Sequence, residues 1–377
     1  MPSQPVEARN PSRSLPKLCK LFPLLIRAVV GRCSADPAAW SYSCRARPPP
    51  PLPPAPIAVT PTAGDAVIVE PRALRRLPFV LRNVWGQLPR GSWSMHLVHG
   101  QHISSQLRHA AVRSLLVTGK LHLRRLDHML DAAGIWSADN LTGRAWYNKM
   151  LLSSAFWGSF QSPLLLLFEA DSVLCPSPSR PLHTFAGYGF VGAPWAPYYG
   201  GWFPFWCRNL AACVGNSGLS LWARPILQNL TSRPPSAYED VVASYLRISR
   251  GSATKRGMGS TKALYSHKGN LTFSSQLIVH IDVWVSVLLQ SLQHAGALPA
   301  LAGPAVPSDT IASRFSVETL YAETNAAAWV PFGVHKPHAY LPTAQLEQLY
   351  ARCPPARELA RLMNDSKLDV LDARSWA

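Results

Sequence analysis

Residues 163–172 read Pro-Leu-Leu-Leu-Leu-Phe-Glu-Ala-Asp-Ser, and this stretch decides which fold the chain can adopt. Residues 163–168 form an unbroken apolar run of strand length, without the alternation of a half-buried strand. A strand of this kind is covered on both faces, which is typical of the centre of a parallel sheet. We therefore place it in the middle of an α/β sheet.

Two further segments on the N-terminal side have the same strand character. Residues 66–70 and 95–99 are short apolar runs, and helical patterns follow them over 71–85 and 101–116. Another helix is predicted over 144–160, where large apolar side chains recur at helical spacing. Because strands and helices alternate, we predict one α/β domain whose mostly parallel central sheet is flanked by helices.

Composition divides the chain into three parts. Residues 1–64 are rich in Pro and poor in acids, so we expect a disordered targeting or linker segment there. Residues 65–349 are expected to form the folded domain, with 250–305 as an inserted, partly disordered segment. Residues 350–377 are expected to form a C-terminal helical tail.

The 377 residues carry a net charge of +17, from 37 Lys and Arg against 20 Asp and Glu. This balance suits nucleic acid, an anionic membrane or a phosphate-bearing ligand, and a bias toward Arg codons is the plainer explanation. Because the Arg residues are scattered and no nucleic-acid motif occurs, we expect no nucleic-acid partner. No run of about 18 apolar residues occurs, and the apolar stretch 278–292 contains His280 and Asp282, which argues against a polytopic membrane protein.

The compartment is indicated by three weak signals. The apolar run 21–30 is compatible with a signal peptide, an organellar transit peptide or a weak anchor that would associate with a membrane. Four N-glycosylation sequons occur, at Asn140, Asn229, Asn270 and Asn364. They favour the secretory pathway, with the Golgi as the expected compartment, over an organelle.

The third signal is the set of seven cysteines, which contains no Cys-x-x-Cys pair and so gives no support to a zinc ribbon. Cys207 and Cys213 are spaced for a local disulfide in an oxidising compartment. Buried free thiols are the alternative for these residues.

Glu169 and Asp171 follow the central strand directly and are the strongest chemical signal in an acid-poor chain. Ligands of open α/β sheets bind beyond the carboxyl ends of the strands. Two carboxylates in this spacing point the same way on an extended chain and suit a hard divalent cation that also holds phosphate oxygens. The alternative is a pair of solvated strand-end acids, or a cap for the element that follows.

Three later motifs have polar groups suited to a ligand. Residues 215–221, Gly-Asn-Ser-Gly-Leu-Ser-Leu, allow a close backbone approach, and an ordinary turn is the alternative. Glu239 and Asp240 open an apolar helical run, either as helix N-terminal charges or as a general base. His335 follows an apolar stretch as a metal ligand, a phosphate contact or a structural histidine.

Taken together, these blocks resemble the glycosyltransferase-like family of domains of unknown function numbered 5672. The shared blocks are Tyr147-Asn148, Phe156-Trp157, residues 169–172, 188–195 and 215–221, Glu239-Asp240, Phe315-Ser316-Val317-Glu318 and residues 333–336. The blocks occur in the same order as in the family and extend over about residues 65–345. Glu169, Ser217 and Trp222 depart from the family pattern, which has Gln, Gly and Arg at these positions.

The resemblance implies a GT-A-like nucleotide-sugar fold and a set of site residues. Metal ligation is implied for Glu169, Asp171 and His335, with Mn²⁺ or Mg²⁺ as the cofactor. Catalysis is implied for Asp240 and Glu239. Contact with the nucleotide sugar is implied for Glu70, Arg72, His99, Asn148, Asp171, Ser172, Gly215, Asn216 and Gly218.

The function expected on these grounds is a metal-dependent glycosyltransferase. It would move a sugar from a nucleotide sugar to a hydroxyl of an acceptor glycan or small molecule, with Asp240 accepting the proton if the reaction inverts configuration. The alternative is a catalytically inactive sugar- or nucleotide-binding module of the same fold.

Overall fold

The computed structural model describes residues 33–35, 42–44, 63–101, 103–135, 145–195, 210–245, 281–298, 304–319, 321 and 329–364. The chain divides into two compact units, residues 1–55 and 56–377. In the first unit, β1 (Cys33–Ala35) pairs antiparallel with β2 (Tyr42–Cys44). Most of the segment 1–64, which we expect to be disordered, lies outside the described residues.

The second unit contains the α/β fold. Its strands are β3 (Gly64–Glu70), β4 (Trp93–His99), β5 (Leu121–Arg125), β6 (Leu164–Phe168), β7 (Ser172–Leu174), β8 (Phe190–Val191), β9 (Leu219–Ala223), β10 (Ser316–Val317) and β11 (Gly333–His335). Its helices are α2 (Leu77–Gln87), α3 (Ser104–Leu107), α4 (Ala110–Val117), α5 (Leu126–Ala132), α6 (Ala145–Leu151), α7 (Ser154–Gly158), α8 (Arg224–Leu230), α9 (Glu239–Tyr245), α11 (Ile281–His294), α12 (Asp309–Phe315), α13 (Thr343–Arg352) and α14 (Pro354–Asn364).

The central sheet has six strands in the order β5-β4-β3-β6-β9-β8. The four strands from β5 to β6 are parallel, and β9 is antiparallel to both β6 and β8. The predicted α/β fold with a mostly parallel central sheet is therefore confirmed. The predicted run 163–168 is β6, which lies between β3 and β9 in the sheet.

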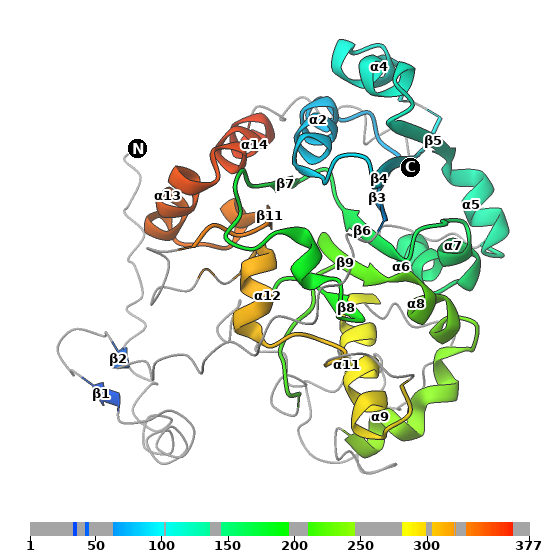
Figure 1. Cartoon of the computed structure of the whole chain (residues 1–377), viewed down its shortest axis with the longest axis vertical. Coiled ribbons are helices and arrows are strands. Elements are labelled where there is room, and N and C mark those ends of the chain that lie inside the picture. Colours follow the sequence, from blue (N-terminus) through cyan, green and yellow to red (C-terminus); the bar gives the residue numbers. More distant parts are fainter. Residues whose placement is uncertain are drawn as a thin grey trace, which may run out of the picture. The chain divides into compact units, whose positions relative to one another are not determined.

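Helices cover both faces of this sheet. Along β6, Leu164, Leu166 and Phe168 belong to one core cluster, while Leu165 and Leu167 belong to the other. The first cluster includes residues of α2, α4 and α14, and the second includes residues of α7, α8 and α11. Figure 1 shows α2 and α14 on one side of the sheet and α5, α6 and α7 on the other. Because each strand face meets a helical layer, the apolar run has no polar alternation.

A second, three-stranded sheet has the order β10-β11-β7. Here β10 runs parallel to β11, and β11 runs antiparallel to β7, with His335 opposite Ser172. The strand that follows the acidic residues is thus joined to segments about 145 and 160 residues later in the chain. This pairing brings the C-terminal motif to the end of β6.

A disulfide fixes the small sheet to the C-terminal helices. Cys175, directly after β7, is bonded to Cys353, between α13 and α14, across a sequence separation of 178 residues. Figure 1 shows α13 and α14 beside β7 and β11. Cys213 is disulfide-bonded as well, whereas Cys207, its partner in one of the two alternatives given above, lies outside the described residues.

Three predicted helices have other bounds in the structure. The helix expected from residue 71 begins at Leu77, because Glu70 binds both the backbone and the guanidinium of Arg72 and turns the chain before the helix. The helix expected over 101–116 is divided at His109, and the helix expected over 144–160 is divided at Ser153. At each break the side chain accepts a hydrogen bond from the backbone N–H two residues later.

The segment 250–305, which we expect to be an insertion, contains the helix α11. This helix is buried along most of its length and belongs to the second core cluster, so it is part of the domain core. The residues 250–280 and 299–303 lie outside the described residues. In the described parts of the chain, no helix is long and apolar enough to cross a membrane.

Candidate metal centre

The candidate site begins where β6 ends. Glu169 and Ala170 form a short turn between β6 and β7, closed by a hydrogen bond from Ser172 N–H to the carbonyl of Glu169 at 3.0 Å. The buried Arg76 donates from Nε to the carbonyl of Ala170 at 3.0 Å, which fixes the turn from the side of α2. Asp171 is buried and Glu169 is half-buried.

His335 at the end of β11 completes a group of three candidate ligands. Its Nε2 lies 3.2 Å from Asp171 Oδ1 and 3.5 Å from Glu169 Oε2. One ligand atom from each residue can be chosen so that all three lie within 4.8 Å of one another. The structure therefore brings together the three residues that the sequence analysis names as metal ligands.

Glu318, which follows β10, lies on the far side of the histidine ring. Its Oε1 is 3.1 Å from His335 Nδ1, and both side chains are buried. A carboxylate on the second ring nitrogen fixes the orientation of a metal-ligating histidine and raises its basicity. Glu318 was not among the predicted site residues, although it belongs to the block 315–318 that resembles the family.

Lys336 adds a positive charge to the same group. Its Nζ lies 2.9 Å from Asp171 Oδ2 and 3.7 Å from Glu169 Oε2. The residue has a left-handed backbone conformation with φ of 45°, and its N–H donates to the carbonyl of Asp171 at 3.1 Å. The backbone thus turns immediately after His335 so that the ammonium group faces the two acids.

These charges shift the pKa values of the three candidate ligands. Burial alone would raise the pKa of Asp171, but the charges of His335 and Lys336 outweigh it and hold that pKa far below its usual range. The pKa of Glu169 is lowered in the same way, against burial, mainly by His335. Burial would lower the pKa of His335, but Glu318 and Asp171 raise it well above its ordinary value.

The residues of this cluster fit a hard divalent cation. Asp171 Oδ1 and both ring nitrogens of His335 are buried and lack a well-aligned hydrogen bond. Buried polar atoms are normally paired, so their incomplete pairing is unusual in a folded protein. Two carboxylates and an imidazole are suitable ligands for Mn²⁺, and the carboxylates for Mg²⁺.

The loop at residues 215–218 packs directly on this cluster. Asn216 has a φ of 72°, and its Oδ1 accepts from Gly218 N–H at 2.8 Å. Gly218 lies so close to the ring of His335 that a Cβ would come within 2.2 Å of His335 Cε1. The carbonyl of Gly218 accepts from Glu169 N–H at 2.8 Å and from Ser172 Oγ at 2.6 Å.

The other predicted nucleotide-sugar contacts lie along the carboxyl ends of the parallel strands. Glu70 ends β3 and lies in register with His99, which ends β4. Arg72 pairs with Glu70 at 2.8 Å, and this hydrogen bond raises the pKa of Arg72 against burial, with smaller contributions from Asp171 and Glu169. Arg72 is therefore within electrostatic reach of Glu169 and Asp171.

The remaining predicted residues are more dispersed. Asn148 in α6 is buried and accepts the N–H of Ile281 at 3.3 Å. A Cβ at Gly215 would collide with the ring of Trp195, which explains the glycine there by packing. Trp222, which replaces the family's Arg, is fully buried in the core.

Glu239 and Asp240 open α9, and Asp240 is exposed. Among the described residues, Asp240 is outside the group of candidate metal ligands. The two helices α9 and α11 run side by side in the same direction. Tyr238 meets Trp284 near their first turns, with ring centroids 6.3 Å apart, and Tyr245 meets His294 at their ends, 5.3 Å apart.

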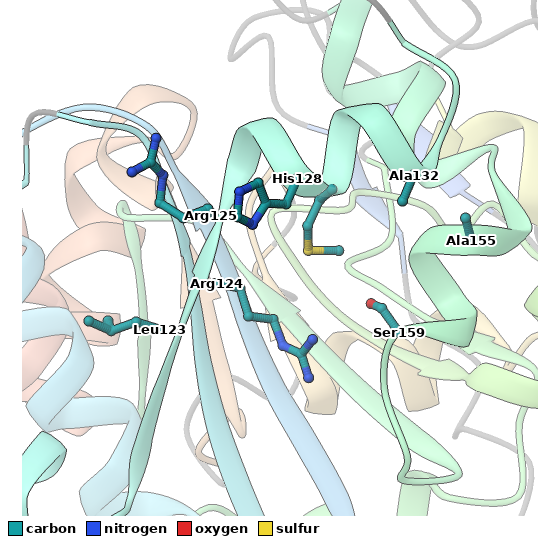
Figure 2. Close-up of a pocket in the computed structure, with 8 residues that line it drawn as sticks. Leu123, Arg124, Arg125, His128, Ala132, Ala155 and Ser159 are labelled. Carbon is teal, nitrogen blue, oxygen red and sulfur yellow. The ribbon is translucent and has the colours of Figure 1, made fainter.

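A separate cavity of about 400 Å³ lies at the outer strand β5, between α5 and α7. It is lined by Leu123, Arg124, Arg125, His128, Met129, Ala132, Ala155 and Ser159. In Figure 2, the guanidinium of Arg124 points toward α7 and Ser159, and that of Arg125 points away. None of the residues predicted from sequence lines this cavity.

Comparison with known proteins gives a family and a set of distant structures. The family described as "Protein of unknown function (DUF5672)" matches residues 135–335. None of the curated proteins matches this sequence.

The similar solved structures include the galactosyltransferase LgtC in complex with donor and acceptor sugar analogues, with 13% identity, a TM-score of 0.40, and coverage of 80% of this chain and 95% of that one. They also include glucosyl-3-phosphoglycerate synthase from Mycobacterium tuberculosis in complex with Mn²⁺, UDP and glucosyl-3-phosphoglycerate. Here the identity is 9%, the TM-score 0.29, and the coverage 44% of this chain and 58% of that one. At these identities and TM-scores, the likenesses by themselves assign no activity to this chain.

Proposed function

This chain belongs to the DUF5672 family, and on that premise we propose that it is a metal-dependent glycosyltransferase that uses a nucleotide-sugar donor. The observation that carries the proposal is the largely buried group of Glu169, Asp171 and His335 at the carboxyl end of the central strand. In open α/β sheets this is the edge where ligands bind. The proposed partners are a nucleotide sugar and an acceptor glycan or small molecule.

In this proposal Asp171, Glu169 and His335 hold a divalent cation, Mn²⁺ or Mg²⁺. These residues would hold the cation, which would supply the positive charge that offsets the charge of the leaving nucleoside diphosphate. Glu318 keeps the His335 ring in place by its contact with Nδ1. Arg72, just after the end of β3, would contact the donor in this proposal; its support is that the charges of Asp171 and Glu169 contribute to the raised pKa of Arg72.

Asp240 is our proposed proton acceptor for the acceptor hydroxyl, with Glu239 beside it. The support is indirect: α9 begins beside the first turn of α11. In that turn Asp282 accepts a hydrogen bond from Ser217 in the loop that packs on His335. The proposed contacts of Glu70, His99, Asn148, Ser172, Gly215, Asn216 and Gly218 with the nucleotide sugar are part of the same proposal.

A second candidate function is a sugar- or nucleotide-binding module without catalysis. It is favoured by one observation, the ammonium group of Lys336 at 2.9 Å from Asp171 Oδ2. This internal cation neutralises part of the acidic cluster without a metal.

One experiment separates the two functions. The purified full chain is incubated with a panel of UDP-sugars, and the release of UDP is measured with Mn²⁺ and with a chelator. Mn²⁺-dependent release supports the enzyme. Mn²⁺-independent binding of UDP, detected by thermal shift, with no release of UDP from any donor, would instead support the module.

We also propose that the protein lies in the secretory pathway. The support is the disulfide between Cys175 and Cys353, since disulfides persist in oxidising compartments and are rare in the cytosol. Asn229, one of the sequon residues, is exposed at the end of α8. Endoglycosidase digestion of the protein from its source cells tests this: a mobility shift is expected, and an unshifted protein in an organellar fraction would overturn it.

A further inference from the structure

The first turn of α11 contacts the loop that packs on the candidate metal centre. Asp282 in this turn is half-buried, and its Oδ1 accepts from the N–H of Val283 at 2.8 Å, as first-turn acids often do. Its Oδ2 accepts from the N–H of Ser217 at 3.2 Å, across 65 residues of sequence. The second carboxylate oxygen of Asp282 therefore joins the start of α11 to the loop at residues 215–218.

Ser217 precedes Gly218, which contacts the candidate metal centre directly. Gly218 lies against the His335 ring, and its carbonyl accepts from Glu169 N–H and Ser172 Oγ. A displacement of the loop would therefore reach His335 and Glu169 together. Asp282 is thus linked to Glu169 and His335 through Ser217 N–H and the contacts of the neighbouring Gly218.

The helix that carries Asp282 is itself fixed on both sides of this contact. Ile281 N–H donates to Asn148 Oδ1, which ties the helix start to α6. Further along α11, the buried Gln290 accepts from Ala212 N–H and donates to Ala212 carbonyl, both at 3.0 Å. The helix is thus tied to the segment just before the loop, and Asp282 to the loop itself.

We infer that Asp282 is a positioning residue of the proposed metal centre. Its carboxylate holds Ser217 so that Gly218 keeps Glu169 and His335 at the spacing that a cation requires. A hydrogen bond from an uncharged N–H to a carboxylate is stronger than one between neutral groups, which suits this role. The inference rests on the proposed function, since it assigns Asp282 to the same site.

The chain offers a matched control in α12. Asp309 is also a first-turn acid that accepts a loop N–H from a distant segment, at 2.8 Å from Cys213. Its contact lies outside the segment 215–218. Asp309→Ala therefore removes the same kind of interaction without touching the loop that packs on His335.

The test measures Mn²⁺ binding to the full chain, with the metal alone, for Asp282→Ala, Asp282→Ser, Asp282→Asn and Asp309→Ala. We expect the Ala and Ser variants at 282 to bind Mn²⁺ about 10-fold more weakly, the size typical of residues that orient metal ligands. Asp282→Asn keeps an acceptor oxygen and should recover most of the affinity. Asp309→Ala should bind as the parent does.

Hydrogen exchange at the Glu169 amide is measured on the same variants without metal. This amide should exchange faster in Asp282→Ala than in the parent or in Asp309→Ala. Parent-like Mn²⁺ affinity in both Asp282→Ala and Asp282→Ser overturns the inference. If the parent binds no Mn²⁺, the proposed function fails. The positioning role of Asp282 is then tested by hydrogen exchange alone, and an unchanged exchange rate at the Glu169 amide in Asp282→Ala overturns it.

Discussion

Two buried histidine–aspartate pairs of almost equal geometry lie at opposite ends of the central strands. His96 Nε2 is 3.3 Å from Asp65 Oδ1, and His335 Nε2 is 3.2 Å from Asp171 Oδ1. Asp65 is the second residue of β3, at its amino end, whereas Asp171 follows the carboxyl end of β6. Ligands bind at the carboxyl ends of parallel strands, so position alone already separates the two pairs.

The surroundings separate them further. Asp65 Oδ2 accepts from Ser162 N–H at 3.2 Å, and His96 Nδ1 accepts from Arg124 Nε at 3.3 Å, so the polar atoms of this pair are used within the fold. His335 instead faces three carboxylates and lacks well-aligned hydrogen bonds. The two pairs therefore differ in their hydrogen bonds. A buried histidine–aspartate pair is a candidate functional site when its polar atoms lack hydrogen-bond partners within the protein.

The largest effect is expected for Asp171→Asn. This change removes one charge of the proposed metal centre and keeps the shape of the side chain. We expect Mn²⁺ affinity, measured by titration of the full chain, to fall at least about 10²-fold, the scale of losing a preorganised electrostatic contact. Asp65→Asn is the control and should bind Mn²⁺ as the parent does; equal losses in both variants would erase the distinction between the pairs.

The next effect is a loss of stability when the other pair is broken. Asp65→Ala removes the carboxylate that pairs with buried His96 and accepts a hydrogen bond from Ser162 N–H, so both groups lose their partner. We expect the free energy of unfolding to fall by about 2 kcal/mol, the cost of stranding buried polar groups. Urea denaturation measures it. The positive charges of His335 and Lys336 keep Asp171 ionised in the fold, so Asp171→Asn should also lower the stability of the metal-free protein. A parent-like stability of Asp65→Ala would contradict the structural role of the His96–Asp65 pair.

A smaller effect is expected for Lys336→Met. Its ammonium group lies beside the carboxylates of Asp171 and Glu169, so it competes with Mn²⁺ for binding to them. Removing it should raise Mn²⁺ affinity on the order of tenfold, the size of one partly screened charge pair. Isothermal titration with Mn²⁺ alone checks this. Weaker binding in the variant would show that Lys336 organises the acids instead of competing for them.

The smallest effect is the pH dependence of stability in the metal-free protein. The pKa of His335 is raised in the folded state, against burial, by Glu318 and Asp171. Its contribution to stability is therefore complete below about pH 6.5, the ordinary histidine value, and is lost as the pH rises through the folded pKa. Between pH 6 and 9 the parent should lose stability more steeply than His335→Gln; identical slopes would contradict this assignment.

Much of the fold could be predicted from local patterns. The apolar run of β6 and the helical stripe of residues 144–160 report burial directly, because the sheet is covered on both faces. The outer strand β5 was not predicted, because its Leu121-His122-Leu123-Arg124-Arg125 sequence is polar and mostly exposed. The breaks at His109 and Ser153 had a local signal, a side chain able to cap the next helix.

The site was predictable only where its residues followed a strand end. Glu169 and Asp171 stood out because the chain has few acids and these two follow a buried strand. Glu318, Arg76 and Asp282 reach the site through pairings across many residues, such as β10 with β11 and α11 with the loop at 217. No spacing in the sequence encodes such contacts, and Asp282 drew notice only as a charge in an apolar stretch.

The disulfide after β7 has a consequence for the order of events during synthesis. A ribosome delivers Cys175, four residues after Asp171, long before it delivers Cys353, 178 residues later. By then β9, α11, β10 and β11 have all been made. The covalent ring can close only around elements that already exist. The disulfide can therefore form only after Glu169, Asp171 and His335 have all been synthesised.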